Sequence, residues 1–329
     1  MKESGFNSIE DLPELSQPAQ VIYSGLLIMA DWISSNSDFF PLTGIDSESV
    51  SDLTARYRDG ITSWNKSFPL RIYSYPESEQ LFLHRFGFKP REFQKVTCQV
   101  INQIKTPGII ILEAPMGLGK TEAALAVAEI VAAKTGCSGL FFGLPTQATS
   151  NGMFGRIHDW LESITDECDS KQSLRLCHGR AALNEEMSHL TRMSHLQNIN
   201  IDEGSNGCVF VNEWFSGRKK TALDDFVVGT VDGFLLTALK QKHLALRHLG
   251  FSKKIVIIDE VHAYDTYMQQ YLQEAIQWMG AYRTPVILIS ATLPGEKRKE
   301  LITAYLKGTG VKKREIHFPE AISDNSYPL

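Results

Sequence analysis

The spacing of apolar residues changes along the chain near residue 80. Within residues 18–36, apolar side chains recur at helical intervals, as at Leu26, Met29 and Ile33, and this spacing predicts an amphipathic helix. Loop-like sequence follows, with a second helix expected within residues 48–64. This first part of the chain therefore predicts helices and a connector without strands.

Beyond this point the chain alternates between short apolar runs and amphipathic segments. The apolar runs predict buried strands at residues 108–115, 138–145, 173–179, 225–231, 253–261 and 284–292. Helices are expected from about Pro90 and at residues 121–136, 149–164, 231–240, 266–279 and 295–308. Residues 180–220 are polar and mixed, which predicts a helix within a surface insertion. Buried strands that alternate with helices predict an α/β fold, with a mostly parallel sheet and helices on both faces.

Length and composition limit the classes of protein that need to be considered. The 329 residues exceed the roughly 250–300 at which a single core stops growing, so we expect one large domain with an appendage. With 43% hydrophobic and 22% charged residues, the composition excludes a disordered, collagen-like or coiled-coil chain. The net charge of -5 means that a nucleic-acid surface would have to be a local patch.

The cysteines and the apolar runs bear on location. None of the five cysteines forms a Cys-x-x-Cys pair, which argues against a disulfide framework or a zinc ribbon and favours a reducing cytoplasm. The apolar run Val21–Ala30 is about half of the roughly 20 residues that a bilayer span needs. No export signal is visible at the N-terminus, so we expect a cytoplasmic protein without a membrane partner.

A glycine-rich segment follows the first predicted strand and precedes an alanine-rich helix. Its sequence, Ala-Pro-Met-Gly-Leu-Gly-Lys-Thr, has the form of a phosphate-binding loop, with Ala114 where the strict pattern has glycine. Glycines allow backbone N–H groups to surround phosphate oxygens at a helix N-terminus. The candidate nucleotide-binding residues are Met116, Gly117, Leu118, Gly119, Lys120 and Thr121. We expect Lys120 to reach the β- and γ-phosphates and Thr121 to coordinate Mg2+, the alternative being a glycine-rich turn with a chance Lys-Thr pair.

A second candidate group is Asp-Glu-Val-His at the end of the strand near residue 258. Because this strand is apolar up to its last residues, its carboxylates should lie at the carboxyl edge of the sheet, where ligands bind in open α/β folds. We expect Asp259 to hold Mg2+ and Glu260 to orient and deprotonate the attacking water, while His262 senses the γ-phosphate. The alternative is a solvated or capping acidic pair.

Two further polar groups flank these motifs. Ser290 and Thr292 end the next strand, where they either contact the Asp259–His262 segment or simply terminate the strand. Gln94 lies in a helix before the phosphate-binding loop. Its amide can pair with the donor and acceptor of an adenine edge, unless it is an ordinary polar helix residue.

Nucleic-acid contacts are expected from two strand ends that carry hydroxyls and amides but no basic residue. One end supplies Thr146 and Gln147, and the other supplies Thr230, Asp232 and Gly233. Both precede predicted helices, where N–H and hydroxyl donors suit a backbone phosphate. Either could instead be an ordinary helix cap.

Taken in order, these motifs resemble those of the first RecA-like domain of a superfamily 2 helicase. More narrowly, EAPMGLGKTEAAL, LPTQATSNGMF, CHGRA, VGTVDGFLL, IIDEVHAYD and ISATLP look like the helicase-nuclease family of type I CRISPR interference, over about residues 80–310. The resemblance implies an ATP- and Mg2+-dependent motor that translocates on, unwinds and degrades DNA. It also implies single-stranded DNA and an RNA-guided CRISPR surveillance complex as partners.

The N-terminal helix extends the resemblance. In that family an HD-type nuclease, which uses a divalent transition metal, precedes the helicase, and Asp31 matches its last metal-binding position. The alternative is a solvated helix residue, and the other His and Asp ligands are absent before Gln17. The implied domains are an HD remnant at 1–45, a linker at 46–80, the RecA-like domain at 81–310 and the start of a connector at 311–329.

No second alternating block and no arginine-rich motif follow residue 292, so the chain looks like a fragment of the whole enzyme. We therefore expect the isolated chain to bind ATP-Mg2+ weakly and neither to unwind nor to cut DNA. The rival interpretations are a helicase or translocase of restriction or RNA metabolism and a non-enzymatic nucleotide-binding docking module. An HD phosphohydrolase acting alone is the weakest alternative.

Overall fold

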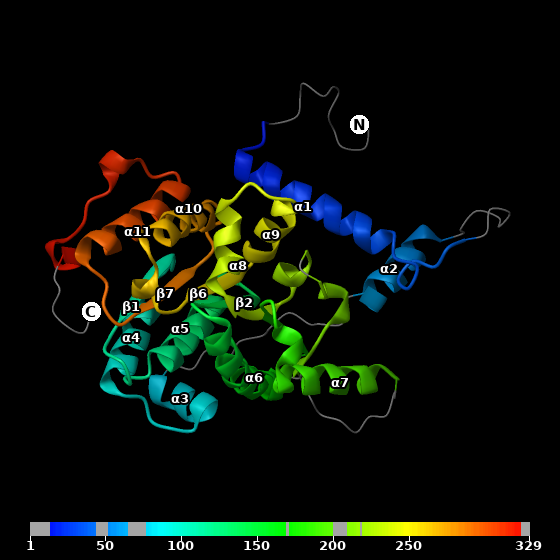
Figure 1. The fold of residues 1–329 in the computed structure, drawn as a ribbon, viewed down its shortest axis with the longest axis horizontal. Coiled ribbons are helices and arrows are strands. Elements are labelled where there is room, and N and C mark those ends of the chain that lie inside the picture. The colour runs from blue at the N-terminus through cyan, green and yellow to red at the C-terminus, as the bar shows by residue number, and fades with distance from the viewer. Residues whose placement is uncertain are drawn as a thin grey trace.

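The computed structural model describes residues 14–43, 52–64, 77–168, 171–199, 209–217 and 219–323. Its centre is a seven-stranded sheet in the order β1-β7-β6-β2-β5-β3-β4, in which each pairing of the described strands is parallel. The strands are β1 (Ile109–Glu113), β2 (Gly139–Leu144), β3 (Gln172–Cys177), β4 (Val209–Phe210), β5 (Phe226–Thr230), β6 (Lys254–Ile258) and β7 (Val286–Ser290). The expected RecA-like α/β architecture is thereby confirmed (Figure 1).

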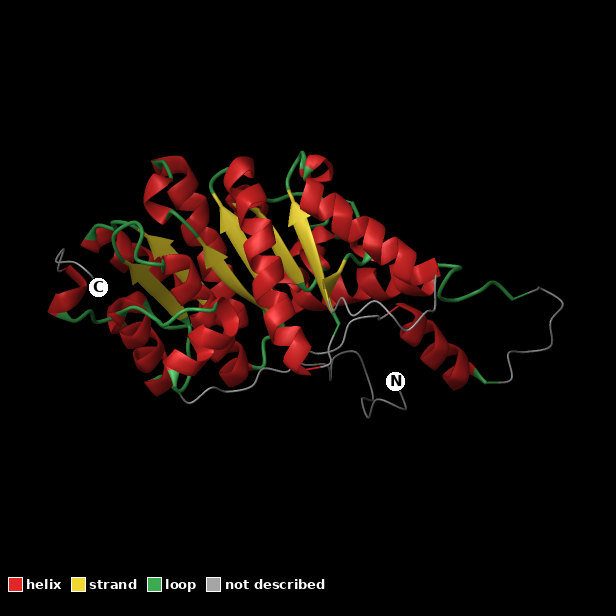
Figure 2. Cartoon of the chain, turned by 90° about the horizontal axis from the view of Figure 1, so that it is seen from below, coloured by secondary structure: helices red, strands yellow, loops and turns green. Residues whose placement is uncertain are grey.

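Helices cover both faces of the sheet (Figure 2). They are α1 (Gln17–Ser34), α2 (Leu53–Trp64), α3 (Ser78–Phe86), α4 (Glu92–Gln103), α5 (Lys120–Thr135), α6 (Gln147–Cys168), α7 (Glu185–Ile199), α8 (Val231–Leu235), α9 (Leu244–Phe251), α10 (Thr266–Tyr282) and α11 (Gly295–Gly308). Alternate residues of the strands point to opposite faces, so the sheet builds two cores. The first core lies against α5 and α6, and the second against α8 to α11.

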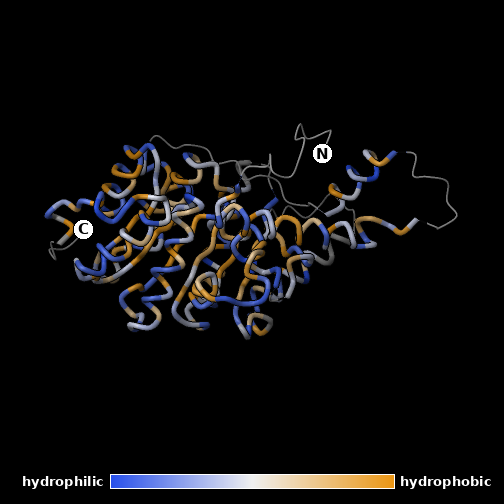
Figure 3. The backbone as a smooth tube through the Cα atoms, turned by 90° about the horizontal axis from the view of Figure 1, so that it is seen from above, coloured by the Kyte–Doolittle hydropathy of each residue, from blue (hydrophilic) through white to orange (hydrophobic). Residues whose placement is uncertain are grey.

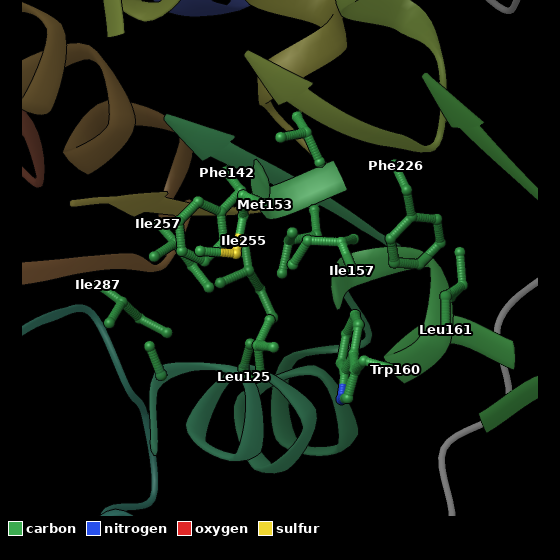
Figure 4. Close-up of a cluster of buried hydrophobic side chains, with 14 of the residues drawn as sticks. Leu125, Phe142, Met153, Ile157, Trp160, Leu161, Phe226, Ile255, Ile257 and Ile287 are labelled. Atoms are coloured by element: carbon green, nitrogen blue, oxygen red, sulfur yellow. The ribbon is translucent and has the colours of Figure 1, made fainter. Parts of the chain in front are cut away.

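The first core shows how the strands and helices interlock. Leu125 of α5 and Ile157 of α6 meet Phe142, Phe226 and other strand residues (Figure 4). The strands are apolar over most of their length because both of their faces are covered, and the apolar segments accordingly gather at the centre of the molecule (Figure 3). Fully burying each large apolar side chain stabilises the fold by roughly 1.5–3 kcal/mol.

The N-terminal helix α1 packs on the lobe rather than standing apart from it. Gly25 faces α9 so closely that an added Cβ would lie 2.6 Å from the carbonyl oxygen of Ala245. Farther along α1, Ile33 joins a smaller cluster with Trp214 and Phe215. The helix expected at residues 18–36 is therefore confirmed, and two separate contacts tie it to the α/β lobe.

Several boundaries differ from the expectations. The helix expected at 231–240 breaks into α8 and a 3-10 turn at Leu236–Ala238, because Gly233 and the β-branched Thr237 give it little helical preference. Two helices, α3 and α9, were missed because each spans only eight or nine residues. The interval expected as an insertion contains α7 and β4, while residues 200–208 and 218 lie outside the described part.

Parts of the expected linker, at 44–51 and 65–76, and the segments 1–13 and 324–329 also lie outside the described residues. Among the described helices, none combines the length and apolar character needed to cross a bilayer.

Candidate nucleotide and nucleic-acid site

The phosphate-binding loop connects β1 to α5 at the carboxyl edge of the sheet. Gly117 and Gly119 both have φ of 80°, in the left-handed region that glycine enters without steric cost. Gly119 caps α5, so the free N–H groups of the first turn point into the loop. This geometry favours an anion such as a phosphate group.

Lys120 lies inside this loop. Its side chain is buried, and its Nζ donates a hydrogen bond of 2.6 Å to the carbonyl oxygen of Ala114. The loop therefore folds around a positive charge at the point where the sequence predicts phosphate binding.

Gln94 braces the same loop from α4. Its Oε1 accepts a hydrogen bond from the backbone N–H of Arg91 (2.8 Å), and its Nε2 donates to the carbonyl oxygen of Gly119 (3.0 Å). A Cβ at position 119 would come within 2.4 Å of that Nε2, so glycine is required for this close approach. The side chain of Gln94 is 1% exposed, and its amide holds the loop; the adenine contact remains a prediction.

Strand register brings the motifs together. Glu113 pairs with Ser290 across β1 and β7, and Ile258 pairs with Leu288 across β6 and β7. The backbone N–H of Ala114 then donates to the carbonyl oxygen of Ser290 (3.3 Å). Three strand ends far apart in sequence thus form one continuous edge.

Asp259 is the buried carboxylate at this edge. Burial raises its pKa to about 6, although the hydrogen bond from the backbone N–H of Glu260 (2.8 Å) and the positive charge of Lys120 act in the opposite direction. The hydroxyl of Tyr264 donates to the carbonyl oxygen of Asp259 (2.7 Å), which holds the strand end in place.

The backbone at Glu260 is strained. Its φ is 54°, a left-handed conformation that costs a residue other than glycine roughly 1–2 kcal/mol. The hydrogen bond from the N–H of Ala263 to the carbonyl oxygen of Glu260 (2.8 Å) closes this turn. Strain of this kind clusters at functional sites.

His262 links the acidic segment to the neighbouring strand. Its Nε2 lies 3.2 Å from Oε2 of Glu260, and its Nδ1 lies 3.2 Å from Oγ of Ser290. Ser290 in turn donates to the carbonyl oxygen of Thr292 (2.9 Å). The structure therefore brings together the acidic and Ser-Ala-Thr motifs, as the sequence predicts.

The two expected nucleic-acid loops differ. Oγ1 of Thr146 accepts from the backbone N–H of Thr149 (3.2 Å), so Thr146 caps α6, and Gln147 next to it is exposed. Thr230 precedes α8 without a side-chain cap, Asp232 is exposed and Gly233 is half-buried. The helix-cap interpretation holds for Thr146, and phosphate contacts at both loops remain predictions.

Asp31 is exposed on α1. Within the described ranges, no three His, Cys, Asp or Glu side chains come together as a possible metal site. In the structure Asp31 is therefore placed as a solvated helix residue, which was the alternative interpretation. Its metal role remains a prediction.

Several supporting residues were not identified from the sequence. Arg91 donates from Nη1 to the carbonyl oxygen of Gly117. Glu113 accepts from the backbone N–H of Leu293 (3.0 Å) and pairs with Arg298 (3.5 Å), which connects the start of the loop to the segment after β7. The sequence signal that could have identified Glu113 is the same as for Asp259, because each is a carboxylate at the end of an apolar strand.

The chain is similar to known proteins in both its N-terminal and its α/β parts. The profile of the DEAD/DEAH box helicase family matches residues 94–301, and that of the Cas3 HD domain matches residues 2–40. The CRISPR-associated nuclease/helicase Cas3 of Streptococcus thermophilus is 57% identical over 329 residues, which is 100% of this chain and 35% of that protein.

Solved structures agree with this similarity. A crystal structure of T. fusca Cas3 with ADP superposes with a TM-score of 0.78 at 30% identity, covering 96% of this chain and 34% of that chain. A structure of a CRISPR RNA-guided surveillance complex, pre-nicking, has a TM-score of 0.63 at 29% identity and covers 99% and 31%. The chain thus spans about a third of the length of the relatives that it matches.

Proposed function

Because the chain belongs to the DEAD/DEAH box helicase family and its relatives are Cas3 nuclease/helicases, we propose that it forms the ATP-binding motor lobe of a CRISPR interference helicase-nuclease. In that role it takes part in translocation on target DNA, unwinding and degradation. The observation that carries the proposal is the single edge at which Lys120, Asp259 and Ser290 end or follow neighbouring strands.

ATP binding follows from the loop. The N–H groups at the start of α5 and the Nζ of Lys120 supply donors and charge for the β- and γ-phosphates. Lys120 would exchange its hydrogen bond to the carbonyl of Ala114 for one to a phosphate oxygen. Gln94 would act at the adenine only if its amide left the loop that it now braces.

The residues fit a Mg2+ ion by donor type. Thr121 would offer a hydroxyl oxygen and Asp259 a carboxylate oxygen, and Mg2+ prefers oxygen ligands shared with substrate phosphates. A buried carboxylate with a raised pKa gains from a nearby cation, which agrees with this assignment. When bound, Mg2+ neutralises charge on the phosphate oxygens.

Glu260 and His262 have distinct proposed roles. Glu260, in the strained turn directly after Asp259, has the carboxylate that would orient a water and take its proton. His262 lies between Glu260 and Ser290, so a change at the γ-phosphate can pass to the strand end that carries Thr292. It serves as a coupling residue.

The wider proposal concerns a full-length helicase-nuclease of the kind that the matched relatives represent. It comprises single-stranded DNA as the track, an HD nuclease with a divalent metal to which Asp31 contributes, recruitment by an RNA-guided surveillance complex, and a cytoplasmic location. The proposed domain boundaries give an HD remnant at 1–45, a linker at 46–80, the RecA-like domain at 81–310 and the start of a connector at 311–329. The support comes from the HD profile match at residues 2–40 and the packing of α1 against α9.

Titration of the purified chain with a fluorescent ATP analogue, with and without Mg2+, tests the proposal. We expect saturable, Mg2+-assisted binding that Lys120→Ala weakens by at least tenfold. Absence of binding at millimolar nucleotide would instead favour a docking module that uses the lobe only as a surface.

A further inference from the structure

Glu122 follows Thr121 in the first turn of α5, directly after the phosphate-binding loop. Its carboxylate lies against the loop, because a Cβ at Gly119 would come within 3.3 Å of the Oε2 atom of Glu122. The helix dipole favours an acidic residue in this first turn. The same position also places a negative charge beside the loop that is proposed to hold the phosphates of ATP, and like charges at short range repel each other.

Arg156 of α6 supplies a positive charge at this point. Its Nη2 donates a hydrogen bond to Oε1 of Glu122 and forms an ion pair with it. The buried core fixes where the two side chains meet. Leu125, almost one turn after Glu122, and Ile157, next to Arg156, belong to the same core cluster (Figure 4). Since α5 begins at the loop, the ion pair lies on the loop side of that cluster.

The charge of Arg156 also acts on Asp259. Burial raises the pKa of Asp259, and the positive charges of Lys120 and Arg156 oppose this effect. The guanidinium group therefore lies within electrostatic reach of the carboxylate that is proposed to hold Mg2+. This holds although α6 carries none of the motifs from which the sequence predicts nucleotide binding.

The guanidinium group of Arg156 has donors that its bond to Glu122 does not use. An arginine carries five N–H donors in a planar fork. Within the described ranges, Arg156 bonds through Nη2 to Glu122, which leaves its Nε and Nη1 for another acceptor. Its side chain is 47% exposed, compared with 21% for Glu122, so a ligand in solution can reach these donors without disturbing the core.

The energetics favour a ligand-binding role over a structural one. An ion pair between partly exposed side chains adds little to the stability of a fold, because water solvates both charges and both side chains lose rotamer freedom. The bonds of a guanidinium group to phosphate oxygens are about twice as strong as neutral hydrogen bonds, and the fork of donors matches the phosphate geometry. Arg156 is therefore better suited to a phosphate than to bracing α5 against α6.

We propose that Arg156 is a phosphate-binding residue of the ATP site, which donates from Nε and Nη1 to the terminal phosphates of the nucleotide while Glu122 holds it beside the loop. The inference deepens the proposed function and rests on it. In P-loop enzymes an arginine stabilises the charge on the γ-phosphoryl group, and in some of them the same chain supplies it. The contact proposed here likewise needs no residue from outside the described lobe.

Titration of the full 329-residue chain with a fluorescent, non-hydrolysable ATP analogue and with fluorescent ADP, both in Mg2+, tests this proposal. Arg156→Gln should weaken binding of the ATP analogue about tenfold, because it removes a charge-assisted bond to phosphate. Arg156→Lys should recover part of the affinity, since an ammonium group keeps the charge but lacks the fork. Both variants should melt close to the wild-type temperature, because the ion pair is exposed.

A double variant separates a direct phosphate contact from simple neutralisation of Glu122. If Arg156 only offset the charge of Glu122, then Glu122→Gln combined with Arg156→Gln would remove both charges and restore the wild-type affinity. A direct contact predicts instead that the double variant keeps most of the loss. Glu122→Gln alone should bind the ATP analogue at least as tightly as the wild type, because the glutamine oxygen still accepts the hydrogen bond from Arg156.

Arg283→Gln is the charge-matched control. Arg283 is exposed at the end of α10, at the opposite edge of the sheet, so both affinities should stay unchanged. A loss confined to the ATP analogue assigns the contact to the γ-phosphate, and an equal loss for ADP assigns it to the β-phosphate. Wild-type affinity in Arg156→Gln, or its restoration in the double variant, would overturn the inference and leave the proposed function standing. Failure of the wild-type chain to bind either nucleotide would contradict the proposed function as well.

Discussion

The Nδ1 atom of His262 lies 3.2 Å from the Oγ atom of Ser290, although 28 positions separate the two residues along the chain. The contact exists because β6 and β7 are neighbours in register and both end at the same edge. It is the point at which the acidic motif and the Ser-Ala-Thr motif touch.

This contact predicts coupling between the two motifs. We expect His262→Ala and Ser290→Ala each to destabilise the fold by roughly 0.5–1.5 kcal/mol, and the double variant by clearly less than the sum. Chemical denaturation of the wild type, the two single variants and the double variant measures these changes in stability.

A positioning role also predicts that each variant reduces the effect of bound oligonucleotide on ATP affinity, while the affinity for ATP in the absence of oligonucleotide stays unchanged. Strict additivity in both readouts would rule the coupling out.

Lys120 and Lys134 provide a matched pair at opposite ends of α5. Lys120→Ala should lower ATP affinity at least tenfold, because the phosphate loop loses its charge. Lys134→Ala should leave ATP affinity unchanged and lower the melting temperature, because Nζ of Lys134 donates to the carbonyls of Ile101, Asn102 and Ile104. Nucleotide titration and thermal unfolding of both variants check this, and the reverse result would contradict the assignment of the loop.

Asp259→Asn tests the proposed magnesium ligand. Removing the negative charge should abolish the gain in ATP affinity that Mg2+ gives to the wild type, while metal-free binding is retained or slightly improved. Titrations with Mg2+ and with EDTA measure the two states. A variant that still responds fully to Mg2+ would remove Asp259 from the metal site.

Gly25 tests the packing of α1 on α9. In Gly25→Ala the new Cβ would lie 2.6 Å from the carbonyl oxygen of Ala245, so we expect destabilisation of roughly 1–3 kcal/mol. Gly152→Ala, in exposed sequence of α6 with nothing within 4 Å, should be neutral or stabilising by roughly 0.5–1 kcal/mol. Denaturant unfolding compares the two, and equal effects would mean that α1 does not dock as described.

His248 predicts an acid-dependent loss of stability. Burial lowers its pKa from 6.5 to about 4, although a backbone hydrogen bond opposes this, and its ring packs against Trp278 at 4.6 Å. Between pH 6.5 and 4 the unfolded state binds more protons, so its contribution is present above pH 6.5 and is lost as the pH falls. From pH 7 to 5 we expect a loss on the order of 1–2 kcal/mol.

Unfolding at several pH values checks this prediction. His248→Gln should flatten the dependence, whereas His189→Gln, at an exposed position of α7, should retain it. An unchanged slope in the His248 variant would show that other groups dominate the acid response.

Much of the nucleotide site was predictable because its signals are local. The strand-loop-helix around Lys120 and the apolar strand that ends in Asp259 each show their geometry within a short stretch of sequence. The carboxyl-edge position then follows from parallel pairing alone. The contact between His262 and Ser290 agrees with that expectation.

Other features depend on tertiary contacts that no local pattern encodes. The burial of Gln94 against Gly119 and the pairing of Glu113 with Arg298 arise only when separate elements pack. At Thr146 the local sequence fits two roles, a helix cap and a phosphate contact. In the structure its hydroxyl caps α6.

The position of β7 between β1 and β6 has a consequence for biosynthesis. In the described sheet, β1 pairs with β7, which is the last strand to leave the ribosome. The apolar strand β1, which precedes the phosphate-binding loop, therefore has no partner strand while most of the lobe is synthesised. A nascent chain arrested before Val286 should expose β1 to chaperones and proteases, and nucleotide should protect it only after β7 has emerged.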